Sequence, residues 1–260
     1  MRFDDRTGRP APWGVLLAVA LLPLGARADE GWGDKASDQK ARAHLKKMSD
    51  FLAGVKDFAI VADEAFDTVD DEGVKLQSNR RRRIWVSRPD RLRSDNTGDS
   101  TDLLFVFRKG GFLLLDKENN SYVAEKGPDT IDGMLDEMAK KYDHLPPLSD
   151  FVRADPGKGL LADVREARNV GPSKIGDHKC HHLAFREKAL DFQLWVEDGD
   201  KPLPRKLVIT YKRQAGQPQY TAVLHHWELG AKNDPKLFDV TPPEGAKKVE
   251  IAPVEPEKKP

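Results

Sequence analysis

Two stretches of this sequence alternate apolar and polar residues with a period of two, and this pattern constrains the fold more than any other feature. The first stretch begins at Phe58, where Phe58, Ile60 and Ala62 alternate with their neighbours up to a turn at 70–73. The second begins near Val164, and no βαβ rhythm separates its segments. Strands spaced by roughly 8 to 12 residues with turn signals between them are typical of an antiparallel sheet.

Gly, Asp and Pro clusters divide both stretches into strands. In the first stretch, the alternation predicts a strand from Phe58, a return strand ending at Val86, a strand after Asp90, and strands near 103–107, 112–115 and 121–124. In the second stretch, it predicts strands near 167–171, 179–187, 191–198, 205–213 and 219–229.

Helical periodicity precedes the first stretch of strands. Ser37 is a candidate N-cap, and Gly54 marks the expected end of the helix. Apolar residues at steps of three and four form a single stripe along it. The stripe consists of Ala41, Leu45, Met48, Leu52 and Val55.

A second helical region, 128–164, lies between the two stretches of strands. Thr130 is the expected cap of its main helix, which ends before Pro146-Pro147, and Ser149 and Asp155 are expected to cap two shorter helices. The apolar face of the main helix consists of Ile131, Met134, Leu135, Met138 and Tyr142.

These elements predict an α+β fold with one strongly curved antiparallel sheet. The amphipathic helices need an apolar partner, and the concave face of the sheet is the surface available to them. We therefore expect a single domain over 29–250 that includes the helical insertion 128–164. The Pro, Glu and Lys-rich segment 251–260 is expected to be a disordered tail.

The first 28 residues have the layout of a cleavable secretory signal peptide. Basic residues precede the apolar run from Trp13 to Leu24, and Ala26-Arg27-Ala28 fits a cleavage site. This run is too short for a stable membrane anchor. With no cysteine directly after residue 28, a lipid-anchored terminus is also unexpected. The sequence thus predicts an exported, soluble mature chain without a transmembrane anchor.

Charge and cysteine content narrow the function classes. The chain has 43 basic and 43 acidic residues, so no net field attracts nucleic acid. Its single cysteine, Cys180, excludes an internal disulfide. We find no nucleophile elbow, zinc-protease motif, phosphate loop or dinucleotide fingerprint, and we expect no catalytic residue and no cofactor.

The helical stripes are candidates for the lining of a hydrophobic cavity. Methionine adapts to irregular apolar ligands, so a cavity lined in this way would suit an acyl chain. The alternative is that the same residues form ordinary core. The candidate residues are Leu45, Met48, Leu52, Met134, Leu135 and Met138.

An arginine cluster between residues 80 and 93 is the strongest local charge. On a strand, Arg81 and Arg83 share a face with Trp85, whereas Arg80 and Arg82 share a face with Ile84 and Val86. One interpretation is a basic rim for lipid headgroups, an anionic membrane or a partner protein, formed by Arg81, Arg83, Arg88 and Arg93. The other is a set of solvated positions on a curved or edge strand.

Histidine and acidic clusters give weaker signals. His178, Cys180 and His182 would share one strand face, and His225 and His226 lie in a later strand, but the spacing matches no zinc motif. The acidic segments 70–73 and 197–200 lack the ligand pattern of a calcium loop and indicate hairpin turns. We therefore expect no metal site.

Several segments resemble an uncharacterised family of predicted periplasmic proteins, the domain of unknown function numbered 2092. The most specific are PLPRKLVIT (202–210) and FDVTPPEGAKKV (238–249), and KMSDFLAGVKDF, SRPDRLR, GFLLLDKENNSY and CHHLAF also match. The resemblance covers roughly 40–250, and the family is similar to the periplasmic lipoprotein-carrier group. It implies an unclosed β-barrel whose concave face is covered by helices, and it implies a periplasmic location.

The resemblance also implies a function without transferring any site residue. Carrier relatives bind lipid or the acyl chains of lipoproteins, and a second branch senses envelope stress. We expect a non-enzymatic periplasmic carrier or sensor of a lipid or acylated lipoprotein. The alternatives are an envelope protein that binds a protein partner through the same fold and, more distantly, a metalloenzyme using His178, His182 and His225.

Overall fold

The computed structural model describes residues 32–99, 101–142, 145–230 and 232–251. The predicted signal peptide (1–28) and residues 252–260 of the predicted tail lie outside the described residues.

The helices are α1 (Lys35–Ala53), α2 (Ile131–Tyr142), α3 (Ser149–Val152), α4 (Pro156–Leu161) and the 3₁₀ turn η1 (Pro235–Phe238). The strands are β1 (Asp57–Val69), β2 (Lys75–Ser87), β3 (Arg91–Gly98), β4 (Thr101–Arg108), β5 (Gly111–Asp116), β6 (Ser121–Lys126), β7 (Glu166–Ile175), β8 (His178–Arg186), β9 (Leu190–Glu197), β10 (Pro204–Tyr211), β11 (Gln219–Leu229) and β12 (Lys247–Lys248).

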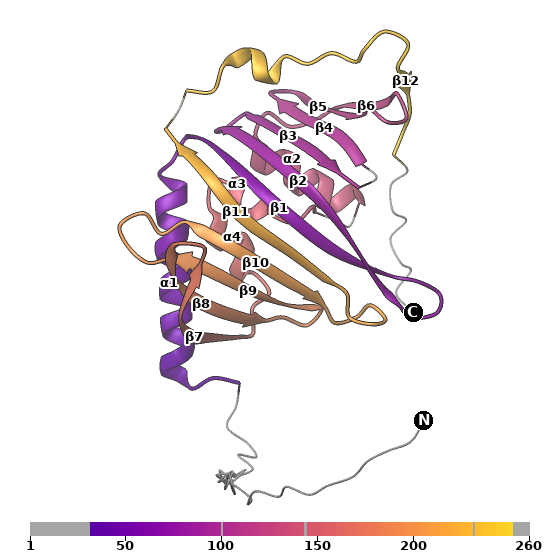
Figure 1. Ribbon diagram of the computed structural model, residues 1–260. Helices are drawn as coiled ribbons and strands as arrows, with labels where there is room; N and C mark the ends of the chain where they lie inside the picture. The colour runs from indigo at the N-terminus through magenta and orange to yellow at the C-terminus, as the bar shows by residue number, and fades with distance from the viewer. Residues whose placement is uncertain (1–31, 100, 143–144, 231, 252–260) are drawn as a thin grey trace, which may run out of the picture. The chain divides into compact units, whose positions relative to one another are not determined.

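The strands form one 12-stranded sheet in the order β12-β6-β5-β4-β3-β2-β1-β11-β10-β9-β8-β7. Each stretch of strands predicted from the sequence forms one half, and the halves join where β1 pairs antiparallel with β11. The short β12 pairs in parallel with β6. The sheet bends around α2, α3 and α4 (Figure 1). It does not close into a barrel, since β12 and β7 are its two edge strands and do not pair with each other. The expected α+β fold with a curved, unclosed sheet is confirmed.

Helix α1 begins three residues earlier than the sequence indicates. Its N-cap is Asp34, whose carboxylate accepts a hydrogen bond from the Ser37 N–H at 2.6 Å, so the prediction of Ser37 as the cap is wrong. The Ser37 hydroxyl instead accepts from the Asn169 N–H at 3.0 Å and ties the helix to β7. Gly54 ends the helix as expected. The predicted stripe is buried over Ala41, Leu45, Met48 and Leu52.

The helical insertion follows β6 and contains α2, α3 and α4. The Thr130 hydroxyl accepts from the Gly133 N–H at 3.1 Å, and the Asp155 carboxylate caps α4 by accepting from the Lys158 N–H at 3.1 Å. The prediction of Ser149 as a cap is wrong, because it is the first residue of α3 and its hydroxyl donates to the Pro146 carbonyl. Leu148 takes the N-cap position at φ 73°, and its side chain is buried.

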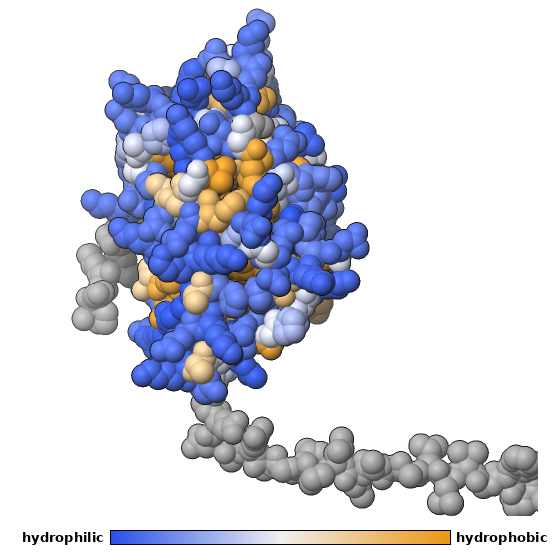
Figure 2. Space-filling view, turned by 90° about the vertical axis from the view of Figure 1, so that its left-hand side faces the viewer, coloured by the Kyte–Doolittle hydropathy of each residue, from blue (hydrophilic) through white to orange (hydrophobic). Residues whose placement is uncertain are grey.

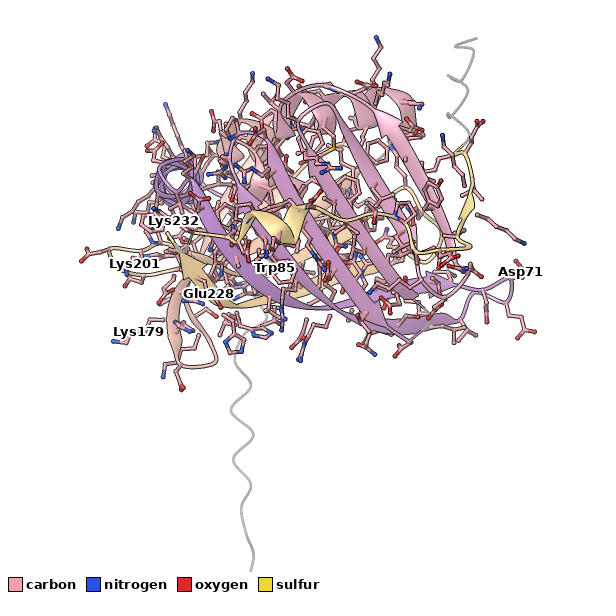
Figure 3. The ribbon with its side chains drawn as sticks, turned by 90° about the horizontal axis from the view of Figure 1, so that it is seen from above. Asp71, Trp85, Lys179, Lys201, Glu228 and Lys232 are labelled. Carbon is pink, nitrogen blue, oxygen red and sulfur yellow. The ribbon has the colours of Figure 1, made fainter. Side chains whose placement is uncertain are left out.

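Apolar clusters lie on both faces of the sheet. The largest lies between the concave face and α1–α4. A smaller one packs on the outer face of β4 and β5 beneath η1, centred on Phe238, with Trp85 against it (Figure 3). Another surrounds Cys180, Trp195 and Val208 on the outer face of the other half.

The surface around α1 is mostly hydrophilic. Figure 2 shows this side, where polar and charged side chains surround a smaller hydrophobic area. Among the helices that the structure describes, none has the length and apolar content needed to span a bilayer.

Candidate functional site

A cavity of about 310 Å³ lies between α2 and strands β2 to β5 on the concave face. Three side chains of α2 form one wall: Met134, Leu135 and Met138. The strands and the segment after α2 supply the remaining apolar lining, which consists of Ile84, Leu92, Leu103, Phe105, Leu114, Pro146, Pro147, Leu148 and Val152. The volume is at the lower end of the range for small-molecule sites.

Four polar residues of β2 and β3 interrupt this apolar lining: Arg80, Arg82, Ser94 and Asn96. The strand register brings them together, because Arg82 lies directly opposite Asn96 and Ile84 lies opposite Ser94. Since alternate residues of a strand point to the same face, the alternation that turns Ile84 inward also turns Arg80 and Arg82 inward. The cavity therefore has an apolar body and a polar end.

The two arginines of the polar end share one carboxylate, Glu64 of β1. The Glu64 side chain has no exposed surface and forms ion pairs with Arg80 and Arg82, the latter at 2.7 Å. The Tyr220 hydroxyl also donates to Glu64, at 2.7 Å. Burial, and then the neighbouring Glu64 charge, raise the pKa of Tyr220. The polar end is thus a buried group with more positive than negative charge.

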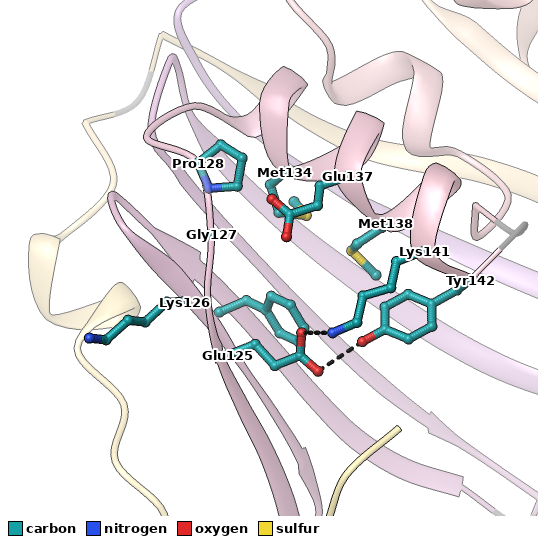
Figure 4. Close-up of a pocket in the computed structure, with 10 residues that line it drawn as sticks. Glu125, Lys126, Gly127, Pro128, Met134, Glu137, Met138, Lys141 and Tyr142 are labelled. Atoms are coloured by element: carbon teal, nitrogen blue, oxygen red, sulfur yellow. Dashed lines mark hydrogen bonds and ion pairs between the residues drawn. The ribbon is translucent and has the colours of Figure 1, made fainter. Parts of the chain in front are cut away.

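A narrow crevice opens beside the cavity where α2 meets the edge strands (Figure 4). Met134 and Met138 line both spaces. The Glu125 carboxylate of β6 accepts hydrogen bonds from Lys141 and from the Tyr142 hydroxyl, the latter at 2.8 Å. The hydrogen bond from Lys141 holds the pKa of Glu125 below its usual range. These contacts attach the last turn of α2 to the sheet.

A second cavity, of about 260 Å³, lies under α3 and α4 against β9 and β10. Its apolar lining consists of Leu145, Phe151, Leu160, Leu190, Phe192, Leu207, Ile209 and the segment 146–148. Its polar groups include Asp150, Glu187 and Tyr211. Burial, with a smaller contribution from Asp163 and Asp150, raises the pKa of Glu187 to about 7.

The segment 146–148 lines both cavities, and α3 follows it directly. Arg88 fixes the position of α3. Its guanidinium is buried and donates to the carbonyls of Leu52 and Val55 at the end of α1, and to those of Phe151 and Val152 of α3. Burial lowers the pKa of Arg88 to about 10.

The predicted cavity residues fall in two places. Met134, Leu135 and Met138 line the first cavity. Leu45, Met48 and Leu52 are fully buried in the packed core between α1 and the sheet, and the structure places none of these three on either cavity. Whether the first three contact a ligand stays a prediction.

The arginines predicted as a rim also separate. Arg81 and Arg83 are exposed on the outer face, where Arg81 pairs with Asp63 at 2.7 Å and Arg83 lies over the Trp85 ring. Arg93 is partly buried, pairs with Asp95 at 2.8 Å and covers the same ring. Arg88 differs from these, because its carbonyl contacts keep it inside the molecule. The prediction that it lies on a rim is wrong, since Arg88 follows β2 in the turn before β3 and its side chain is buried against α1 and α3.

The histidines make local pairs. His178 Nδ1 lies 2.9 Å from a carboxylate oxygen of Glu197, while the His182 ring stacks on Trp195. His225 Nε2 lies 3.0 Å from Asp63. Within the part of the chain that the structure describes, no cluster of three or more His, Cys, Asp or Glu side chains could hold a metal ion.

The acidic segments 70–73 and 197–200 connect neighbouring strands. Asp70 accepts from the N–H groups of Glu72 and Val74, which closes the turn between β1 and β2. The other segment lies between the paired strands β9 and β10. Both are hairpin connections, as expected.

Sequence reasoning missed the polar end of the cavity. Its signal was nevertheless present: Glu64 continues the inward alternation of Phe58, Ile60 and Ala62, and Ser94 and Asn96 continue that of Leu92. Polar residues at inward positions of a half-buried strand indicate either a buried network or a site. The predicted rim of Arg81, Arg83, Arg88 and Arg93 did not include Arg80 and Arg82, which line the cavity.

Solved structures are similar to this chain in fold. The crystal structure of an uncharacterized conserved protein from Thermus thermophilus has a TM-score of 0.50 and 11% identity, covering 81% of this chain and 99% of that one. The lipoprotein LppX from Mycobacterium tuberculosis has a TM-score of 0.46 and 11% identity, covering 74% and 96%. A LolA superfamily protein from Nitrosomonas europaea has a TM-score of 0.41 and 9% identity, covering 78% and 97%.

At these identities, the likeness to the Thermus protein concerns the fold alone. No curated protein matches the sequence. A family model described as predicted periplasmic protein (DUF2092) matches residues 41–252. Since the match covers most of the chain, this protein belongs to the DUF2092 family of predicted periplasmic proteins.

Proposed function

We propose that this protein is a non-enzymatic periplasmic carrier or sensor that binds a hydrophobic ligand, a lipid or the acyl chain of a lipoprotein, on the concave face of its sheet. The observation that carries the proposal is the cavity between α2 and strands β2 to β5, with its flexible methionine wall. The description of the family as predicted periplasmic proteins supports a periplasmic location for this chain.

The cavity supplies the free energy for binding an acyl chain. Each methylene moved from water into apolar surroundings contributes about 0.8 kcal/mol, so a chain of about ten carbons contributes roughly 8 kcal/mol before the costs of association. At about 30 Å³ for a water-sized group, 310 Å³ holds on the order of ten heavy atoms. A single short chain therefore fits this conformation of the helices.

Native mass spectrometry of protein purified from its own cell envelope tests the proposal. We expect a bound species whose mass matches a lipid or fatty acid and which organic extraction removes. A protein that is free of lipid from the envelope, and that takes up no amphiphile after extraction, would contradict it.

A cavity-filling variant locates the ligand. Leu114 faces the cavity from β5, so Leu114→Trp fills part of its volume and should reduce the co-purified lipid by most of its amount. Leu76→Trp is the matched control, because it adds the same ring to a side chain that is 54% exposed on β2. Equal lipid content in both variants would place the ligand elsewhere.

Binding of a protein partner is the competing outcome. In-cell crosslinking should yield lipid-dependent products if the cavity holds the ligand. A partner that remains attached after delipidation would favour an interaction protein. The same preparation tests the leader, since N-terminal sequencing of the periplasmic fraction should begin at Asp29.

A further inference from the structure

We infer that the ligand of the first cavity carries an anionic head group, a carboxylate or a phosphate, which binds at the polar end formed by Arg82, Ser94 and Asn96. This inference rests on the proposed function and specifies the chemistry of its ligand. A purely apolar chain would leave the buried Ser94 hydroxyl without a partner, and the excess positive charge of the two arginines would repel a cation.

The balance of charge supports the inference. Arg80 and Arg82 both pair with Glu64, and among the described residues Glu64 is the one carboxylate paired with either arginine. Two guanidinium groups offer many more N–H donors than a single carboxylate can accept, particularly since Tyr220 also donates to it. The site therefore retains one uncompensated positive charge beside an apolar cavity, where a second anion would be stabilised.

Unpartnered polar atoms give independent support. Arg82, Ser94 and Asn96 are 7%, 8% and 9% exposed, and all of them line the cavity. The Ser94 hydroxyl oxygen and the Asn96 side-chain oxygen have no hydrogen-bond partner among the described residues. A buried polar group without a partner costs about 1–3 kcal/mol. The Ser94 hydroxyl can donate to a head-group oxygen, and so can the Asn96 NH2 group, whereas the unpartnered Asn96 oxygen only accepts and gains no bond from an anion.

The position of these groups sets the orientation of the ligand. Asn96 lies opposite Arg82 on one side and opposite Leu103 on the other, and Ser94 lies opposite Phe105. The polar atoms thus border the apolar wall provided by β4 and α2. A head group at Arg82 directs its chain along Phe105 towards Met134 and Met138.

Titration calorimetry of the delipidated full chain tests this inference with three ligands of one chain length. These are decanoate, decyl phosphate and decyltrimethylammonium, with decanol as the neutral reference. We expect both anions to bind at least about tenfold more tightly than decanol, because a hydrogen bond to a charged group is worth about 1.5–3 kcal/mol. The better anion identifies the head-group class, and the ammonium compound should bind least.

Two variants and one control test whether the polar end causes the preference for anions over decanol. Arg82→Met leaves Glu64 balanced by Arg80 and should weaken anion binding by about tenfold to a hundredfold while decanol binding stays within about twofold. Asn96→Asp places a carboxylate opposite Arg82 and should have the same effect, which covers the case in which the first variant does not fold. Arg81→Met removes the same charge from the outer face and should change neither.

The outcomes distinguish failure of the head-group preference from failure of hydrophobic binding as a whole. If decanol and decanoate bind equally, or if Arg81→Met and Arg82→Met weaken anions alike, the inference is wrong and the hydrophobic binding function stands. If none of the amphiphiles binds, the proposed function itself is wrong.

Discussion

The two cavities on the concave face have similar walls and opposite polar groups. The cavity beneath α2 contains Arg80 and Arg82 with one carboxylate to balance them, whereas the cavity beneath α3 and α4 contains Asp150 and Glu187. Burial raises the pKa of both these carboxyl groups, so the second cavity favours their neutral forms. The apolar lining is therefore common to both cavities, and their polar groups differ, since those of the first are mainly basic and those of the second include two carboxyl groups.

The largest loss of stability should come from removing the Glu64 carboxylate, which pairs with both arginines of the first cavity. Glu64→Gln leaves the buried Arg82 guanidinium and the partly buried Arg80 guanidinium without a counter-charge, and we expect a loss of about 3–5 kcal/mol in the free energy of unfolding. Asp63→Asn is the matched control, because Asp63 is the preceding residue of β1 and pairs with Arg81 on the exposed face. Urea unfolding of both variants measures the contrast, and equal losses would contradict it.

Arg88 should rank second, because it fixes the helix between the cavities. Arg88→Met removes the guanidinium donor from four carbonyls at the ends of α1 and α3, of which that of Leu52 keeps a bond from the Val55 N–H, for a loss of about 3 kcal/mol. Arg83→Met is the control on the exposed outer face. Hydrogen exchange should show faster exchange in α3 for the first variant alone. Unchanged exchange there would show that packing, not Arg88, holds α3.

A smaller effect concerns the pH dependence of the second cavity. The folded state raises the pKa of Glu187 from 4.5 to about 7, so it binds more protons than the unfolded chain between these values. The free energy of unfolding should therefore decrease as pH rises through this window, and the Glu187 contribution should stay at its lower value at higher pH. Glu187→Gln should remove that fall, about 1 kcal/mol after allowing for the solvent contact of a half-buried group.

Unfolding free energies of the wild type and Glu187→Gln across this pH range give the test. The variant should gain stability relative to the wild type as pH rises from 4.5 to about 7, and the difference should be smallest at the acidic end. A constant difference would show that Glu187 titrates normally in the folded protein.

The smallest effect should be on anion binding when the second cavity is filled. Ile209→Trp occupies space between β10 and α3 and should change decanoate affinity by less than about twofold. Leu114→Trp, in the first cavity, should abolish binding in the same titration. If Ile209→Trp weakens binding as strongly, one ligand spans both cavities.

The sequence predicted the strands well because their period is regular and their turns are marked. It misplaced the helix caps at Ser37 and Ser149, since a neighbouring residue, Asp34 or Leu148, took each position. At α1 the Asp34 carboxylate accepts the capping hydrogen bond, whereas Leu148 makes no side-chain capping bond to α3. Apolar spacing indicates that a helix is present but does not identify its first residue.

The candidate site was predicted only in part, for a different reason. Helical spacing predicts that Met134, Leu135 and Met138 share one face of α2. It does not predict a cavity, because a cavity depends on the distance between α2 and the sheet. The burial of Arg82 beside Glu64 depends on the register between β1 and β2. Alternation in the sequence predicts which face of the sheet a residue occupies, but it does not predict which residue of the neighbouring strand lies opposite it.

The pairing of β1 with β11 has a consequence for how the chain folds. Phe58 lies opposite Leu229, so the middle of the sheet joins residues from opposite ends of the domain. Hairpins within each half form between close neighbours, whereas this seam requires closure of a long loop and is slow to form. We therefore expect synthesis of nearly the whole domain to precede its completion. We expect the hairpins of each half to form first and the pairing of β1 with β11 to form last.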